Sequence, residues 1–256
     1  LGVLQPEQAD IALSRLALQT RDRACEALRR CELVFEAVPE VIEAKQQTFA
    51  WVSEHVPASA IIASTTSTFL VTELSEMVST PARFVNAHWL NPAHLMPLVE
   101  VSRSAATCPQ VVERLLQLLK RIGKVPVVCN PVAGYIVPRI QALAMNEAAR
   151  MVEEGVASAE DIDTAVRMGF GLRFSVLGLL EFIDWGGGDI LYYASRYLSG
   201  ALAPRFESPQ VIADNMHNGR NGLRDGQGFY DYRELDVEAY KQQRMGAFVQ
   251  KLASSG

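Results

Sequence analysis

The chain has 256 residues, 49% of them hydrophobic and 21% charged, which is the composition of an ordinary globular protein with a sizeable core. Its 24 basic and 29 acidic side chains give a net charge of -5 without a Lys/Arg run, so we expect no nucleic-acid partner. Apolar runs stay below the roughly 18 residues of a spanning helix and no signal-like segment opens the sequence, which predicts a cytoplasmic protein with no membrane partner.

The first half of the chain alternates between short apolar runs and amphipathic segments. Helices are predicted at residues 6–20, 41–55, 68–78 and 108–123, and strands at 32–40, 60–65, 83–89, 96–102 and 124–130. Because strands that alternate with helices pair in parallel, this order predicts a parallel sheet that is covered on both faces.

Beyond residue 130 the pattern becomes helical, starting with one long helix at 137–155 and a capped helix that begins after Ser158. We therefore expect an α/β fold class with two domains, an α/β domain at 1–130 and an all-α domain at 131–256. The four cysteines form no C-x-x-C pair and indicate reduced, mostly buried thiols, so we expect no metal site.

A histidine and a glutamate lie at the ends of two neighbouring predicted strands. His88 ends the first, and Glu100 lies on the next, so the carboxylate can return beside the imidazole. A carboxylate that accepts one ring N–H leaves the other nitrogen basic, which is the arrangement of a general base. Two unrelated strand-end residues would give the same spacing, and the spacing alone does not decide between these readings.

A run of five hydroxyl residues, 64–68, follows the buried strand "AIIA". Loops at the carboxyl ends of parallel strands are where open α/β sheets bind ligands. Most of these hydroxyls suit the cap of the next helix, and one of them is expected to face the site.

At these positions the chain resembles the L-3-hydroxyacyl-CoA dehydrogenases, which include the 3-hydroxybutyryl-CoA dehydrogenases. The resemblance is carried, in the family's order from Cys31 to Tyr232, by "LVFEAVPEVIEAK", "ASTTST", "AHWLNP", "MPLVEV", "GKVPVVCN", "AGYIVPRI", "NEAARMVEEGVASAEDIDTAVRMGFG" and "GQGFYDY". It implies a Rossmann-like dinucleotide-binding domain followed by an all-α domain that closes over the acyl chain and forms a homodimer. The implied reaction, a step of fatty acid metabolism, is the NAD-dependent interconversion of a 3-hydroxyacyl-CoA and its 3-oxoacyl-CoA.

The resemblance also implies roles for single residues. His88 matches the catalytic base, Glu100 its partner carboxylate, and Ser67 the serine that bonds the substrate oxygen and helps to hold the nicotinamide. The cofactor-binding positions are Ala37, Glu40, Lys45, Thr65 and Asn91. At the start of the long helix, Pro138 stands where the family has an asparagine that contacts the substrate. Apart from the resemblance, the guanidinium group of Arg139 suits either an anionic substrate or an acidic partner within the fold.

Three departures from the family pattern bear on activity. The G-x-G-x-x-G turn is absent because Leu1 already lies past it, so we expect the chain to lack at least one βαβ unit of roughly 30 residues and to bind the dinucleotide weakly. Pro138 supplies no side-chain donor. Thr65 replaces an asparagine and Trp89 is larger than usual, which suggests an altered substrate. The alternatives are a dehydrogenase of a small 3-hydroxy acid, carnitine-like or a sugar acid, and a dimerising fragment without catalytic competence.

Overall fold

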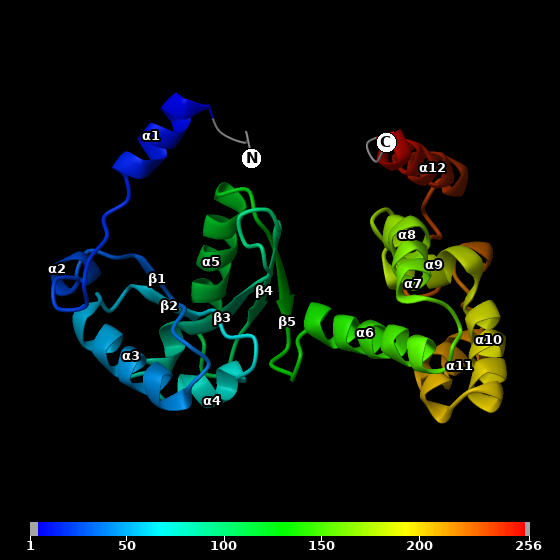
Figure 1. Cartoon of the computed structure of the whole chain (residues 1–256), viewed down its shortest axis with the longest axis horizontal. Coiled ribbons are helices and arrows are strands. Elements are labelled where there is room, and N and C mark those ends of the chain that lie inside the picture. Colours follow the sequence, from blue (N-terminus) through cyan, green and yellow to red (C-terminus); the bar gives the residue numbers. More distant parts are fainter. Residues whose placement is uncertain (1–4, 254–256) are drawn as a thin grey trace. The chain divides into compact units, whose positions relative to one another are not determined.

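A computed structural model describes residues 5–253 of the chain (Figure 1). The backbone divides after Asn146 into two compact units. The elements up to that division are α1 (Pro6–Ser14), α2 (Cys25–Leu28), β1 (Leu33–Glu36), α3 (Ile42–His55), β2 (Ile61–Ser64), α4 (Val71–Ser75), β3 (Phe84–Trp89), β4 (Leu98–Ser102), α5 (Pro109–Arg121), β5 (Val125–Cys129) and the first part of α6 (Val137–Glu153). The domain boundary that the sequence suggests near residue 130 stays a prediction.

The first unit contains a five-stranded sheet in the order β1-β2-β3-β4-β5. All neighbouring strands pair in parallel except β3 and β4, which are antiparallel. The prediction of a parallel sheet is therefore wrong at this one pair. No helix intervenes between Trp89 and Leu98, and a short connection without a crossover brings a strand back only in the opposite direction.

Helices cover both faces of this sheet, as the sequence predicts (Figure 1). On one face, Phe49 of α3 and Leu74 of α4 pack with Phe84 of β3 in a buried apolar cluster. On the other face, Leu115 and the rest of the apolar side of α5 pack on β2, β3 and β4. Each of these side chains contributes about 1.5–3 kcal/mol on burial, so the sheet is a rigid support for the residues at its strand ends.

Two helices are shorter than the sequence predicts. The first ends at Ser14 instead of residue 20, and none of its residues is buried, so no packing extends it. The helix α4 begins only at Val71 because the Thr66 hydroxyl accepts hydrogen bonds from the backbone N–H groups of Thr68 and Phe69, which holds these residues in a turn.

The second unit is helical. Its elements are the remainder of α6, α7 (Ala159–Ala165), a π-helical stretch (Val166–Gly171), α8 (Leu172–Phe174), α9 (Leu179–Gly186), α10 (Gly188–Ala201), α11 (Gln210–His217) and α12 (Val237–Ala253). Ser158 caps α7 as predicted, since its hydroxyl accepts a 3.1 Å hydrogen bond from the N–H of Asp161. Within residues 5–253, no helix is both long and apolar enough to cross a bilayer.

A buried aspartate joins α9 to the "GQGFYDY" segment of the second unit. Asp184 accepts hydrogen bonds from the N–H groups of Phe229 and Tyr230 and from the hydroxyl of Tyr232. The chain approaches so closely that a Cβ at Gly222 or Gly228 would lie 2.1 Å from an Asp184 oxygen. These glycines leave room for the aspartate, which gives the segment a structural role.

Candidate active site

The central contact of the first unit joins His88 to Glu100. The two residues lie directly opposite each other in the antiparallel register of β3 and β4. The Nδ1 atom of His88 is 2.8 Å from Oε2 of Glu100, and the side chains are 5% and 0% exposed. The predicted return of the carboxylate to the imidazole is confirmed, whereas the catalytic role of the pair stays a prediction.

The second oxygen of Glu100 is held by backbone. Its Oε1 accepts 2.9 Å hydrogen bonds from the N–H groups of Ile136 and Val137, at the start of α6. These two donors and the positive end of the helix dipole fix the carboxylate in one orientation. Since a carboxylate accepts hydrogen bonds, His88 carries its proton on Nδ1, and Nε2 is left as the basic nitrogen. Nε2 has no hydrogen-bond partner among the residues that the structure describes.

A tyrosine that sequence reasoning did not select completes this cluster. The ring of Tyr135 stacks on that of His88, with centroids 5.2 Å apart and planes inclined by 22°. Burial raises the pKa of the Tyr135 phenol, and the nearby Cys129, Glu40 and Glu100 raise it further. Tyr135 therefore remains a neutral phenol at physiological pH.

A pocket of about 410 Å³ opens at the carboxyl ends of β1, β2 and β3. Its lining brings together four predicted positions with two aromatic rings and an alanine: Phe35, Ala37, Thr65, Ser67, Trp89, Asn91 and Ala93. A nicotinamide ring is flat and aromatic and carries one amide group. The aromatic walls, two hydroxyls and one side-chain amide of this pocket fit such a ring.

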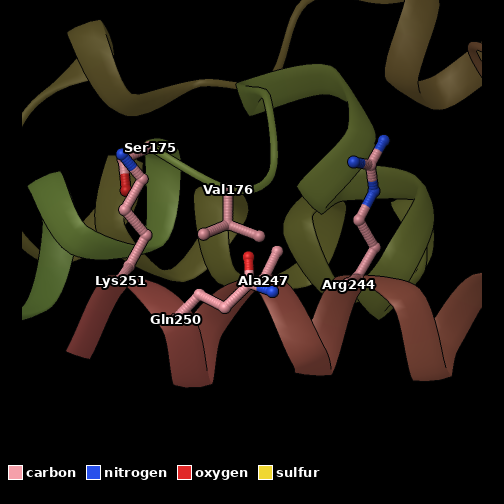
Figure 2. Close-up of a pocket in the computed structure, with 6 residues that line it drawn as sticks. All are labelled: Ser175, Val176, Arg244, Ala247, Gln250 and Lys251. Atoms are coloured by element: carbon pink, nitrogen blue, oxygen red, sulfur yellow. The ribbon is translucent and has the colours of Figure 1, made fainter. Parts of the chain in front are cut away.

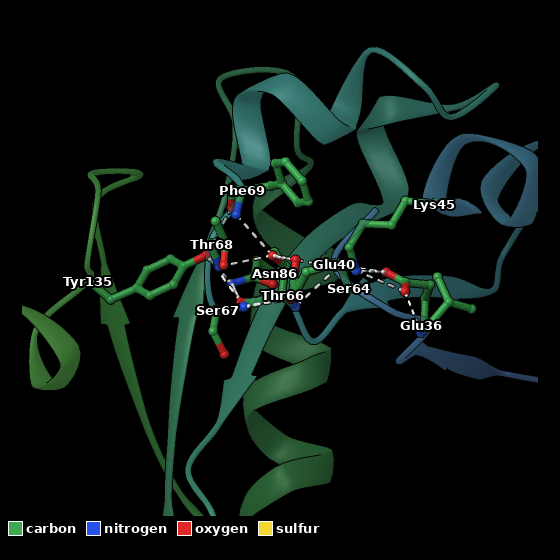
Figure 3. A network of polar contacts seen from close by, with 11 residues as sticks. Glu36, Glu40, Lys45, Ser64, Thr66, Ser67, Thr68, Phe69, Asn86 and Tyr135 are labelled. Atoms are coloured by element: carbon green, nitrogen blue, oxygen red, sulfur yellow. Dashed lines mark hydrogen bonds and ion pairs between the residues drawn. The ribbon is translucent and has the colours of Figure 1, made fainter. Parts of the chain in front are cut away.

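Glu40 and Lys45 are not among the lining residues of this pocket. They belong to the polar network that Figure 3 shows. Lys45 is 1% exposed, and its ammonium group is 3.0 Å from Oε1 of Glu36. Glu40 accepts a 2.8 Å hydrogen bond from the Thr66 hydroxyl and a 3.1 Å bond from the N–H of Ser67. These contacts hold the turn that carries Ser67, and direct cofactor contact by Glu40 or Lys45 stays a prediction.

Two of the three predicted substrate residues, Pro138 and Arg139, lie in the first turn of α6. Pro138 contributes no side-chain donor, as the sequence requires. Arg139 is exposed, and its guanidinium group has no hydrogen bond or ion pair within the described part of the chain. No contact joins either residue to His88, so their substrate roles stay predictions.

A wall of the pocket is built by an aromatic pair. Trp89 meets Phe35 edge to face, with centroids 5.5 Å apart. The ammonium group of Lys124 lies 5.3 Å from the centre of the Trp89 ring and donates hydrogen bonds to the carbonyl groups of Ala93 and Met96. The Trp89 indole is therefore fixed on two sides.

A second groove lies in the helical unit, along α12 (Figure 2). Its polar wall includes Arg244, which is 2.6 Å from the carboxylate of Glu181. Glu181 also accepts hydrogen bonds from the N–H of Gly178 and the hydroxyl of Tyr240. The guanidinium group of Arg244 is therefore already paired with a carboxylate.

Two family models match consecutive parts of the chain. The model described as the 3-hydroxyacyl-CoA dehydrogenase NAD binding domain matches residues 1–132, and that of the C-terminal domain matches residues 134–232. The chain belongs to the 3-hydroxyacyl-CoA dehydrogenase family, and it is an NAD-dependent oxidoreductase of that family.

Individual relatives differ in the substrates that they are named for. The 5-formyl-3-hydroxy-2-methylpyridine 4-carboxylate 5-dehydrogenase of Mesorhizobium japonicum is 32% identical over 86% of this chain and 71% of its own length. The 3-hydroxyadipyl-CoA dehydrogenase of Escherichia coli is 35% identical over 91% of this chain, which spans 48% of that enzyme. The crystal structure of a 3-hydroxyacyl-CoA dehydrogenase from Archaeoglobus fulgidus superimposes with a TM-score of 0.78 at 29% identity, covering 97% of this chain and 88% of that one. These comparisons do not confirm the expected lack of a βαβ unit.

Proposed function

We propose that the protein interconverts a 3-hydroxyacyl-CoA and its 3-oxoacyl-CoA, with His88 as the general base and Glu100 as its orienting carboxylate. The observation that carries the proposal is the buried 2.8 Å contact between Nδ1 of His88 and Glu100, which leaves Nε2 without a protein partner among the described residues. The family membership supplies the reaction class.

In this proposal each residue of the site has one task. When bound, NAD would supply the acceptor for the hydride at C3 of the substrate. Nε2 of His88 takes the proton of the 3-hydroxyl group, and Glu100 stabilises the imidazolium that forms. The Ser67 hydroxyl donates a hydrogen bond to the same substrate oxygen, which becomes the 3-oxo group. In the reducing direction the imidazolium returns its proton to that oxygen.

The same proposal assigns the nicotinamide to the pocket at the strand ends. Ala37, Thr65, Ser67 and Asn91 would hold it there, with the aromatic pair as one wall. Aromatic faces and hydroxyl donors suit a planar ring that bears an amide. Titration with NADH, followed by its fluorescence, measures this binding without turnover, and a Thr65→Val variant tests the hydroxyl donor.

Replacing the base tests the proposal. His88→Ala is expected to lower turnover by about 10²-fold or more, the scale of a general base. The matched control is His217→Ala, because His217 is exposed on α11 and bonds only the Ala213 carbonyl among the described residues. An unchanged turnover rate in a folded His88→Ala protein would contradict the assignment of His88 as the general base.

A second candidate is a hydroxy acid that carries no CoA. Two observations favour it, namely the relative named for a pyridine carboxylate and the absence of a donor at Pro138. Comparing acetoacetyl-CoA with free 3-oxo acids in an NADH-consumption assay separates the two candidates. Preference for the thioester by kcat/KM supports the first, and preference for the free acid supports the second.

We also propose that the protein is a homodimer that uses its helical unit. Exposed apolar side chains gather on α10 and α12, where Tyr193, Tyr197, Met245, Val249 and Leu252 are 53–74% exposed. Such surfaces are typical of subunit interfaces. Light scattering coupled to size exclusion measures the mass in solution, and a monomer at micromolar concentration would contradict this proposal.

A further inference from the structure

We infer that Tyr135 is a positioning residue that orients His88 through its ring and the Ser67 turn through its hydroxyl group. The inference rests on the proposed role of His88 as the base. Tyr135 lies in the loop before α6, outside both the hydroxyl-rich turn and the strand β3 that carries His88.

The ring acts on the imidazole. Glu100 holds His88 at Nδ1, but this one hydrogen bond does not by itself fix the orientation of the imidazole ring. The Tyr135 ring, nearly parallel to the imidazole at 5.2 Å and itself only 4% exposed, closes one face. An edge contact together with a face contact restricts the direction of Nε2, which must point at the substrate hydroxyl.

The hydroxyl acts on the neighbouring strand and turn (Figure 3). It accepts a 2.8 Å hydrogen bond from Nδ2 of Asn86, two residues before His88 on β3, so both side chains lie on one face of the sheet. It also donates toward the carbonyl groups of Phe69 at 3.1 Å and Thr66 at 3.3 Å. Ser67 lies between these two carbonyl groups in sequence, so the phenol fixes the turn that presents it.

The backbone at Tyr135 adds a third link. Its φ of 44° lies in the left-handed region, which is strained for a residue with a side chain and persists only where the surroundings hold it. The next two N–H groups are those that bind Glu100. Three consecutive residues therefore contact the base, its carboxylate and the serine turn, and the buried phenol is the anchor of this segment.

Two substitutions separate the ring from the hydroxyl. Tyr135→Phe keeps the stack on His88 and removes the hydroxyl contacts, whereas Tyr135→Leu removes both. The control is Tyr232→Phe, because Tyr232 is also buried and hydrogen-bonded, but to Asp184. We would measure kcat and KM separately with acetoacetyl-CoA, and record the imidazole Hε1 resonances of the protein without substrate. The chain has four histidines, and the resonance missing from His88→Gln identifies His88.

The two parts of the inference predict different results. Tyr135→Phe should retain the upfield ring-current shift of His88 and hold kcat within about twofold, while KM rises about 3- to 10-fold, the scale of one buried hydrogen bond. Tyr135→Leu should lose the ring-current shift and lower kcat by about tenfold or more relative to Tyr135→Phe. Tyr232→Phe should leave the His88 resonance, kcat and KM unchanged.

Several outcomes would overturn the inference. One is a folded Tyr135→Leu protein with an unmoved His88 resonance and the kcat of Tyr135→Phe. If that variant does not fold, two other results decide. A Tyr135→Phe protein with the KM of wild type would contradict the role of the hydroxyl group. A His88 resonance of the wild-type protein that shows no upfield shift would contradict the stacking of Tyr135 on His88. Turnover of His88→Gln keeps the two hypotheses apart, because an active His88→Gln contradicts the proposed function itself, whereas an inactive one leaves Tyr135 to be judged alone.

Discussion

Replacing Glu100 by glutamine tests the site with the smallest change in shape. Glutamine keeps one carbonyl oxygen, and the N–H groups of Ile136 and Val137 require that oxygen as their acceptor. The new NH₂ group then faces Nδ1 of His88, which must become an acceptor. The ring proton moves to Nε2, the nitrogen that we propose as the base, and Nε2 can no longer take a proton from the substrate.

The expected loss of activity follows from these contacts. A hydrogen bond between charged partners contributes about 1.5–3 kcal/mol, which corresponds to about 10- to 150-fold in rate. The unsuitable tautomer adds to this loss and brings the total toward about 10⁴-fold. We therefore expect Glu100→Gln to lower kcat by at least about 10²-fold, with a smaller change in KM.

The assay is the initial rate of NADH consumption with acetoacetyl-CoA near pH 7, with thermal unfolding measured on the same preparation. Glu181→Gln is the matched control, since Glu181 also accepts a backbone N–H and a side-chain donor but lies in the helical unit. It should lose stability and keep its kcat. A folded Glu100→Gln protein whose kcat stays within about threefold of wild type would refute the reasoning.

Two further predictions concern the helical unit. Burial by itself raises the pKa of Glu181, but the hydrogen bonds of Tyr240 and Gly178 and the nearby Arg244 cation outweigh it and lower that pKa below its ordinary 4.5. A carboxyl group whose pKa is lowered in the folded state stabilises the fold at pH values above its ordinary pKa, and this stabilisation is lost as the pH falls through the lowered pKa. The denaturation midpoints of wild type and Glu181→Gln should therefore converge as the pH falls from about 6 to about 3. A difference between the two midpoints that does not change with pH would contradict this prediction. Gly222→Ala places a Cβ 2.1 Å from the α9 backbone at a φ of 96° and should cost at least about 2 kcal/mol in chemical denaturation. Gly246→Ala, with no atom within 4 Å of the new Cβ, should instead gain about 0.5–1 kcal/mol, and equal stabilities of the two variants would overturn the packing argument.

The parts of the site that the sequence predicts are those with short separations. His88 and Glu100 are twelve residues apart on neighbouring strands, and the hydroxyl turn follows its strand directly. Periodicity and strand spacing are sufficient for such contacts. The contacts of Tyr135 span 49 residues to Asn86 and 69 to Thr66, and no local pattern reports them.

Buried ion pairs are a second limit of sequence reasoning. Lys45 matches a cofactor-lining position by resemblance, yet its ammonium group is buried against Glu36. The position of Lys45 in a predicted helix does not determine which way its side chain points. That direction depends on how α3 packs on the sheet. Once packed, a charged group in the interior requires a partner of opposite charge, and Glu36 of β1 supplies it.

The antiparallel pairing of β3 with β4, which sequence reasoning missed, brings the proposed base and its carboxylate together. Opposite residues of an antiparallel pair have Cβ atoms about 4.5–5.5 Å apart on one face, so an imidazole and a carboxylate there meet within hydrogen-bond distance. A parallel return of β4 would need a crossover of about a dozen or more residues, whereas only the loop between Trp89 and Leu98 is available. A register shift of one residue would turn Glu100 to the opposite face, away from both His88 and the N–H groups at the start of α6. The short loop and the buried apolar face of β4 therefore determine this contact together.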